Sequence, residues 1–225
     1  DGGIIEGGNH VISNLYCNEN INDINAQNVG LFSNIRSHSI IRNVIVENGM
    51  FIGNNHVGGI FGISWWGTVI NCHVINSTVV GEHSVGGLGG GANRDDASSS
   101  VIVNCSASGS VFGDTEVGGL IGYCGGIMTN CYSNCKISPI HRRTKFSNIG
   151  GTVGNAGGYI SNCYTAGDIE CDTNYENIAG GFCGSFQDGK ACFVYAQRFP
   201  IIGKTENDCI ISDTTSFNDN YLQSA

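Results

Sequence analysis

The sequence predicts an all-β protein, a right-handed parallel β-helix (β-solenoid) of about six coils of 28–32 residues with three short strands per coil. Two short motifs recur in phase along most of the chain. The segments between them are rich in Val, Ile and Thr and are broken by Gly pairs and Asn, which favours short strands over helices. The right hand follows the general preference of parallel crossover connections.

The first motif is a glycine pair flanked by apolar residues, as in Val117–Gly122. Its second glycine, taken as the marker, falls at Gly30, Gly59, Gly87, Gly119, Gly151 and Gly181. The intervals are 29, 28, 32, 32 and 30 residues, which is the length that three short strands and their turns require. Each interval is therefore one coil, and neighbouring coils supply the core that a single coil cannot bury.

The second motif is an Asn followed by a small apolar residue. It is found at Asn43-Val44, Asn71-Cys72, Asn104-Cys105, Asn130-Cys131, Asn162-Cys163 and, without the Asn, Ala191-Cys192. Apolar residues stand both two places before and one place after the Asn, and simple alternation would put these on opposite faces. A left-handed turn at the Asn reverses the phase, so we expect a corner where Asn side chains bond from coil to coil. The alternative is that these Asn residues occupy solvated loops.

The 11 cysteines follow neither a zinc pattern nor a small disulfide scaffold. Those of the second motif would face inward in one column: Cys72, Cys105, Cys131, Cys163 and Cys192. Tetrahedral zinc needs four ligands around one point, whereas a column spreads them along a line. We therefore expect buried free thiols packed as small hydrophobic groups, with no metal and no cofactor, rather than a redox or metal ladder. A disulfide among the remaining cysteines stays open: Cys17, Cys124, Cys135, Cys171, Cys183 and Cys209.

One domain of residues 1–225 is expected. Residues 1–27 would form an N-terminal opening coil or cap, 28–197 the repeat coils, and 198–225 a C-terminal cap that protects exposed strand edges. No apolar run is long enough to cross a bilayer, and no signal peptide is recognisable, so we interpret the chain as a mature or trimmed piece of a larger protein or assembly. The net charge of -9 argues against a nucleic-acid partner.

The two motifs together resemble the GLUG repeat, most clearly in Val117–Gly122 followed by Thr129–Ser133, and in Ile149–Gly154 followed by Ile160–Ile169. The resemblance covers residues 1 to about 195. It implies large bacterial exported proteins, namely adhesin-like surface proteins and the non-catalytic repeat regions of IgA-specific metalloendopeptidases. Such peptidases need a His-Glu-x-x-His zinc helix, and none of the six histidines begins one. The high cysteine content departs from most such repeats.

Three groups of residues are candidates for binding. Tyr132, Tyr164 and Phe193 would form an outward aromatic stripe on the column of His73, which could contact sugars or a protein, or only stabilise the stack. Trp65 and Trp66, at a turn, could anchor a partner or pack on the solenoid wall. Arg142 and Arg143 lie in a basic insertion that could meet an anionic glycan, or remain a solvated loop.

The favoured function is a non-catalytic structural or adhesive module of an extracellular or cell-surface protein or filament. A glycan-binding module is the alternative, and a carbohydrate-active β-helix enzyme is third, because the carboxylates do not share one repeat column as such enzymes require. The expected partners are a host or matrix glycan or protein, and other copies stacked end to end.

Overall fold

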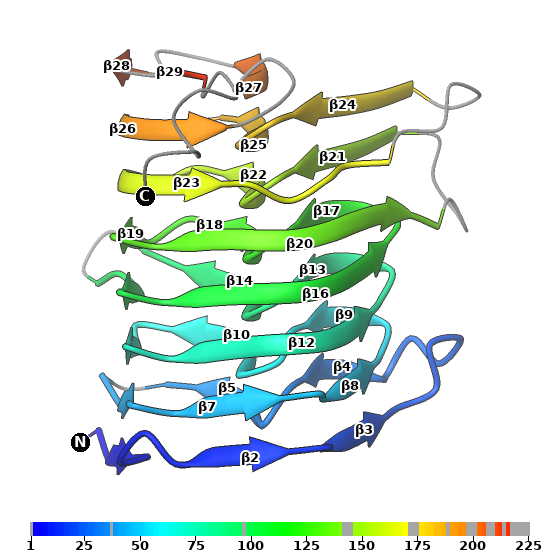
Figure 1. Ribbon diagram of the computed structural model, residues 1–225, viewed down its shortest axis with the longest axis vertical. Helices are drawn as coiled ribbons and strands as arrows, with labels where there is room; N and C mark the ends of the chain where they lie inside the picture. Colours follow the sequence, from blue (N-terminus) through cyan, green and yellow to red (C-terminus); the bar gives the residue numbers. More distant parts are fainter. Residues whose placement is uncertain are drawn as a thin grey trace.

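A computed structural model describes residues 2–36, 38–95, 98–140, 146–170, 176–187, 190–196, 202–205, 210–212 and 215–216. Within these ranges the regular structure consists of strands, and the all-β prediction is confirmed. The strands stack into three sheets, here called A, B and C, which form the walls of a β-solenoid with three strands per coil (Figure 1).

Sheet A has sixteen strands and contains both sides of the Asn corner. Its strands before the corner are β1 (Ile4–Glu6), β6 (Ile40–Arg42), β11 (Thr68–Ile70), β15 (Val101–Val103) and β19 (Ile127–Thr129). Those after the corner are β2 (Val11–Ser13), β3 (Tyr16–Asn18), β7 (Ile45–Glu47), β8 (Met50–Ile52), β12 (His73–Val80), β16 (Ser106–Gly113) and β20 (Tyr132–Pro139). The last strands are β23 (Tyr159–Thr165), β26 (Lys190–Ala196), β28 (Ile210–Ser212) and β29 (Thr215–Ser216).

Sheets B and C close the coil. Sheet B has six strands: β4 (Gln27–Val29), β9 (Asn55–Val57), β13 (His83–Gly86), β17 (Thr115–Gly118), β21 (Phe146–Gly150) and β24 (Glu176–Gly180). Sheet C has seven: β5 (Phe32–Ile35), β10 (Phe61–Trp65), β14 (Gly89–Asn93), β18 (Ile121–Cys124), β22 (Val153–Ala156), β25 (Cys183–Phe186) and β27 (Ile202–Thr205).

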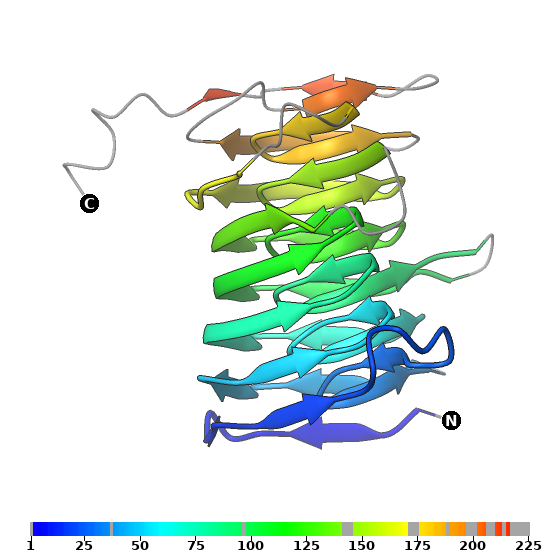
Figure 2. The ribbon, with the colours of Figure 1, turned by 90° about the vertical axis from the view of Figure 1, so that its right-hand side faces the viewer.

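Neighbouring strands within each sheet are parallel and lie in register from coil to coil. In Figure 1 the chain runs from left to right along sheet A in front and returns behind it through sheets B and C while it rises. This is a right-handed coil, as predicted. Figure 2 shows the same stack from the side.

The core consists of columns of equivalent side chains. Two places before the Asn corner stand Ile41, Val69, Ile102, Met128 and Ile160, and one place after it stand Val44, Cys72, Cys105, Cys131 and Cys163; all ten are buried. Both positions can face inward because Asn43, Asn71, Asn104, Asn130 and Asn162 have φ between 50° and 58°. The left-handed residue reverses the alternation within sheet A, as its sequence position predicts.

A second left-handed column lies in sheet B, one place before the apolar residue of the glycine motif. It contains Asn28, His56, Ser84 and Glu116, with φ between 50° and 60°. The third glycine of the motif, in sheet C, packs on this column: a Cβ on Gly90 would lie 2.4 Å from the backbone carbon of His56, and one on Gly122 equally close to that of Ser84. Sheets B and C can approach each other this closely because these glycines carry no side chain.

The first coil is covered by a neighbouring coil on one side only within the described residues. Strands β1 and β2 each pair on one edge only, with β6 and β7. Their inward residues Ile5 and Ile12 are 42% and 39% exposed, whereas Ile41 and Val46 in the next coil are 2% and 0% exposed. Residues 1–27 thus form a first coil whose inner face is uncovered.

Candidate functional site

Tyr132 and Tyr164 form a stacked pair on the outer face of sheet A. They are partners in register, their ring centroids are 5.2 Å apart, the planes differ by 7°, and 39% and 40% of their surfaces are exposed. Each ring covers one face of the other, so the pair offers less ring surface to a ligand than two separate rings would. This arrangement stabilises neighbouring coils by cross-strand contact.

The alignment of Ala191-Cys192 with the Asn-Cys motif is wrong. In the structure Cys192 pairs with Ser161, Val194 with Cys163, and Tyr195 with Tyr164. Cys192 therefore leaves the cysteine column and Phe193 leaves the tyrosine column, each by two residues. The physical reason is that this coil has no Asn at the corner, so the Cys alone was a misleading marker.

Trp65 and Trp66 lie at the corner between sheets C and A, and both are partly buried. Trp66 has φ 63°, which is unusual for a bulky residue, and its backbone N–H donates to Ser100 Oγ at 3.1 Å. Its indole N–H is buried and has no hydrogen-bond partner in the described part of the chain. The pair therefore packs into the wall more than it projects from it.

The basic insertion with Arg142 and Arg143 lies outside the described residues. The other insertion, between β14 and β15, is described except for residues 96 and 97 and projects from the stack in Figure 2.

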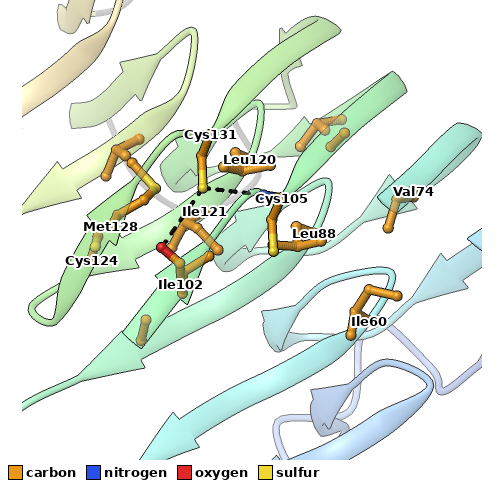
Figure 3. Close-up of a cluster of buried hydrophobic side chains, with 14 of the residues drawn as sticks. Ile60, Val74, Leu88, Ile102, Cys105, Leu120, Ile121, Cys124, Met128 and Cys131 are labelled. Atoms are coloured by element: carbon orange, nitrogen blue, oxygen red, sulfur yellow. Dashed lines mark hydrogen bonds between the residues drawn. The ribbon is translucent and has the colours of Figure 1, made fainter. Parts of the chain in front are cut away.

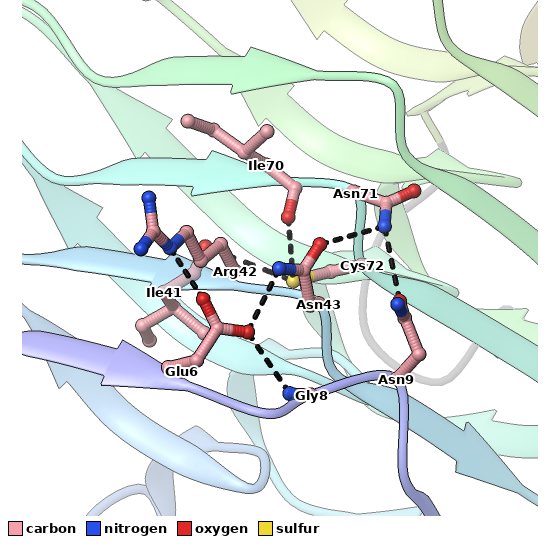
Figure 4. A network of polar contacts seen from close by, with 9 residues as sticks. All are labelled: Glu6, Gly8, Asn9, Ile41, Arg42, Asn43, Ile70, Asn71 and Cys72. Atoms are coloured by element: carbon pink, nitrogen blue, oxygen red, sulfur yellow. Dashed lines mark hydrogen bonds and ion pairs between the residues drawn. The ribbon is translucent and has the colours of Figure 1, made fainter.

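The Asn corner carries a polar network in the first coils (Figure 4). Asn71 Nδ2 donates to Asn43 Oδ1 at 2.7 Å, and Asn43 Nδ2 donates to Glu6 Oε1 at 2.8 Å. These bonds join three coils. Together with the backbone N–H of Gly8, the amide of Asn43 lowers the pKa of Glu6.

The network changes partners above Asn71. His73 Nε2 lies 3.1 Å from Asn71 Oδ1, and His73 Nδ1 lies 2.8 Å from Ser106 Oγ. His73 thus occupies the acceptor that Asn104 would have used. Among the described residues, Asn104, Asn130 and Asn162 keep the left-handed backbone but make no side-chain bond to one another, and they face solvent. The expected ladder is therefore complete in its backbone and partial in its side chains.

The cysteine column runs through the core (Figure 3). Cys72, Cys105, Cys131 and Cys163 are free thiols, and each points to the carbonyl two residues earlier, at Sγ–O distances of 3.1–3.4 Å. Cys17, Cys124 and Cys135 are also free. The thiols act as small packing groups that each satisfy a corner carbonyl.

Hydrogen bonds with Cys105 lower the pKa of Cys72 and Cys131, whereas burial favours the protonated form of the other core thiols. Burial raises the pKa of Cys124 and of Cys135 to about 12, and that of Cys105 and Cys163 well above the ordinary value. A thiol in this state is a poor nucleophile and a poor metal ligand.

The free energy of unfolding should therefore fall as the pH rises from about 9 to about 12. In this window the thiol of Cys124 is protonated in the folded protein and ionised in the unfolded chain, whose ordinary pKa is 9.0. The unfolded state binds fewer protons, so alkali favours it. Urea denaturation at several pH values should give a shallower decline for Cys124→Ala than for the wild type. Identical slopes would contradict this origin of the pH dependence.

A polar cluster that was not predicted from the sequence joins sheets B and C. Glu116 accepts hydrogen bonds from Ser84 Oγ at 2.5 Å and from Asn155 Nδ2 at 2.9 Å. Burial lowers the pKa of the nearby His56, and the charge of Glu116 partly opposes this. The donor pair holds the carboxylate between two coils, which is a bracing role.

Several cavities are open at the surface of the described part. One of about 350 Å³ lies beside Cys17 and Gly30, and one of about 160 Å³ opens on the inner face of Ile5. A third, of about 470 Å³, is lined by Arg94, Asp95, Ser99 and Tyr159. In the described residues no three His, Cys, Asp or Glu side chains are grouped to hold a metal ion, and no helix could span a membrane.

Comparison with known proteins gives one partial similarity. No family model and no solved structure matches the chain. A curated protein, Halomucin from Haloquadratum walsbyi, is 34% identical over 106 residues, which cover 47% of this chain and 1% of Halomucin. The GLUG resemblance stays a prediction based on the motifs quoted above, and the chain is similar to a small part of a very long protein.

Proposed function

We propose that the chain is a non-catalytic structural and adhesive module of an extracellular or cell-surface protein. The observation that carries this is the stacking itself: equivalent side chains from successive coils form buried columns. Such a stack gives a stiff rod whose length grows with the number of coils.

The positions of the acidic groups support the non-catalytic part. Glu82 and Asp114 are fully buried, and Glu116 is held by Ser84 and Asn155. An acid–base pair for glycoside cleavage has to face the substrate with two carboxyl groups about 5–10 Å apart. Glu82 and Asp114 are instead withdrawn from the surface, and Glu116 is held between two coils.

The similarity to part of Halomucin supports an extracellular or cell-surface location. It also supports a role within a much longer chain. Adhesin and filament roles, and the GLUG assignment, belong to the same proposal.

Turnover assays test the proposal. Purified protein incubated with polygalacturonate, alginate and neutral polysaccharides should release no new reducing ends and no unsaturated products. If the wild type forms products and Glu116→Gln does not, the enzymatic function would replace the structural one.

The uncovered inner face of the first coil supports end-to-end association. Because Ile5 and Ile12 leave the inward columns exposed beside unpaired strand edges, further coils can continue both the columns and the sheet, either from the same longer protein or from a second copy. We expect reversible association at high protein concentration in sedimentation velocity, reduced by Ile12→Lys. Val11→Lys is the matched control, because Val11 lies in the same strand and faces outward. Equal effects of both variants would contradict docking through the inner face.

A further inference from the structure

The cavity of about 470 Å³ between the β14–β15 loop and the start of β23 has the size and lining of a ligand site. Ligand pockets usually measure about 300–1,000 Å³ and carry a few polar groups placed to fix orientation. Its lining combines a guanidinium, a carboxylate, a hydroxyl and an exposed aromatic ring: Arg94, Asp95, Ser99 and Tyr159.

The loop that forms one wall is held by its own hydrogen bonds. Asp95 and Ser98 bond twice, through Ser98 N–H to Asp95 Oδ1 at 2.9 Å and Asp95 N–H to Ser98 O at 2.9 Å. Arg94 and Ser99 form an antiparallel bridge at the base. The next residue, the fully buried Ser100, anchors the loop by donating to Ser64. The polar groups of this wall are therefore positioned before a ligand arrives.

The space above the loop exists because the next coils turn here with glycine pairs. Gly125-Gly126 and Gly157-Gly158 pass this corner, and a Cβ on Gly158 would lie 1.9 Å from Gly126 O. The turns are stacked backbone to backbone and contribute no side chain. The loop of the longer coil thus overhangs a hollow instead of packing against a neighbour.

Tyr159 forms the opposite wall. It is the first residue of β23, it is 48% exposed, and its partners in register are Ile127 in β19 and Lys190 in β26. Among the described aromatic residues the stacked pair is Tyr132 with Tyr164, and Tyr159 has no such neighbour. The exposed part of its ring offers an apolar surface that no other described aromatic ring stacks on.

We propose that this cavity binds a neutral sugar unit of a polysaccharide. A sugar ring offers an apolar face to Tyr159 and hydroxyl groups that can accept from Arg94 and donate to Asp95. Among the described lining residues Arg94 and Asp95 offset each other's charge, and the chain has a net charge of -9, so a neutral sugar is favoured over a uronate or sulfated sugar. The inference deepens the adhesive part of the proposed function, on which it rests.

The test uses the full chain and three probes: cellohexaose, mannohexaose and a hexamer of galacturonate. Titration calorimetry should detect at least one neutral probe. Tyr159→Ala and Arg94→Gln should each weaken it about tenfold. Tyr132→Ala is the matched control, because Tyr132 is similarly exposed on the same sheet, and it should leave the affinity unchanged.

Three outcomes would overturn the site: no neutral probe binds at millimolar concentration, only the galacturonate hexamer binds, or Tyr132→Ala weakens binding as much as Tyr159→Ala. Circular dichroism of each variant checks the fold. If Tyr159→Ala proves to be unfolded, the affinity of Arg94→Gln tests the site instead. Products are assayed in the same samples. Binding without product formation supports both the sugar site and the non-catalytic function. Product formation would overturn the non-catalytic function alone. If there is no binding and no product, the sugar site alone is overturned.

Discussion

Gly122→Ala is expected to destroy the cooperative fold. A Cβ on Gly122 would lie 2.4 Å from the backbone of Ser84 and Val85 and 2.7 Å from Gly90 O. All three contacts are with backbone, so no side chain can move aside, and sheets B and C would have to separate. We expect the free energy of unfolding to fall by more than about 4 kcal/mol, a range seen only for severe core disruption. Circular dichroism and urea denaturation measure it.

Gly3→Ala is the control for the same chemical change. A Cβ on Gly3 would have no atom within 4 Å, and the substitution should change the free energy of unfolding by less than about 0.5 kcal/mol. A Gly122→Ala protein that unfolds at the wild-type urea concentration would show that sheets B and C are not in this close contact.

Leu120→Ala should lower the free energy of unfolding by about 2–5 kcal/mol, the range for truncating a buried leucine side chain. Leu120 follows the glycine pair of its coil and is fully buried. Its backbone bonds to Leu88 on one side and Thr152 on the other, at 2.9 Å each, so the cavity would open in the middle of a column. The stack cannot close it without breaking the register of the neighbouring coils.

Leu31→Ala provides the comparison within the same column. Leu31 occupies the equivalent position in the first coil, where it is only partly buried. Truncating Leu31 should lower the free energy of unfolding by less than half as much as truncating Leu120, measured by the same urea denaturation experiment. Equal losses would mean that burial does not increase from the first coil towards the middle of the stack.

The parts of the fold that could be predicted are those where one residue type repeats. The Asn corner needs a left-handed backbone, and Asn is among the few residues that adopt it readily, so the Asn column reveals the corner. The glycine pairs reveal the coil length in a similar way, because the same residue type recurs once in every coil. Where Asn is missing, at Ala191-Cys192, the alignment slipped by two residues and misplaced Phe193.

The second left-handed column could not be predicted, because its members share a backbone conformation but no residue type. His56, Ser84 and Glu116 have neither size nor charge in common, and packing against the glycines of sheet C imposes their conformation. The cavity beside Tyr159 was hidden for another reason. It joins a loop to a strand two coils further on, and this proximity depends on the glycine turns between them.

The central claim is that coils stack in one register, and a single distance tests it. Val11 and Tyr164 are 153 positions apart in the sequence but belong to one outward column, through Ile45, His73, Ser106 and Tyr132. Five steps of about 4.8 Å place their backbones about 24 Å apart. Pulsed electron–electron resonance between spin-labelled amino acids encoded at these two sites should give one narrow distribution near that value. A broad distribution, or one centred beyond about 35 Å, would contradict the stack.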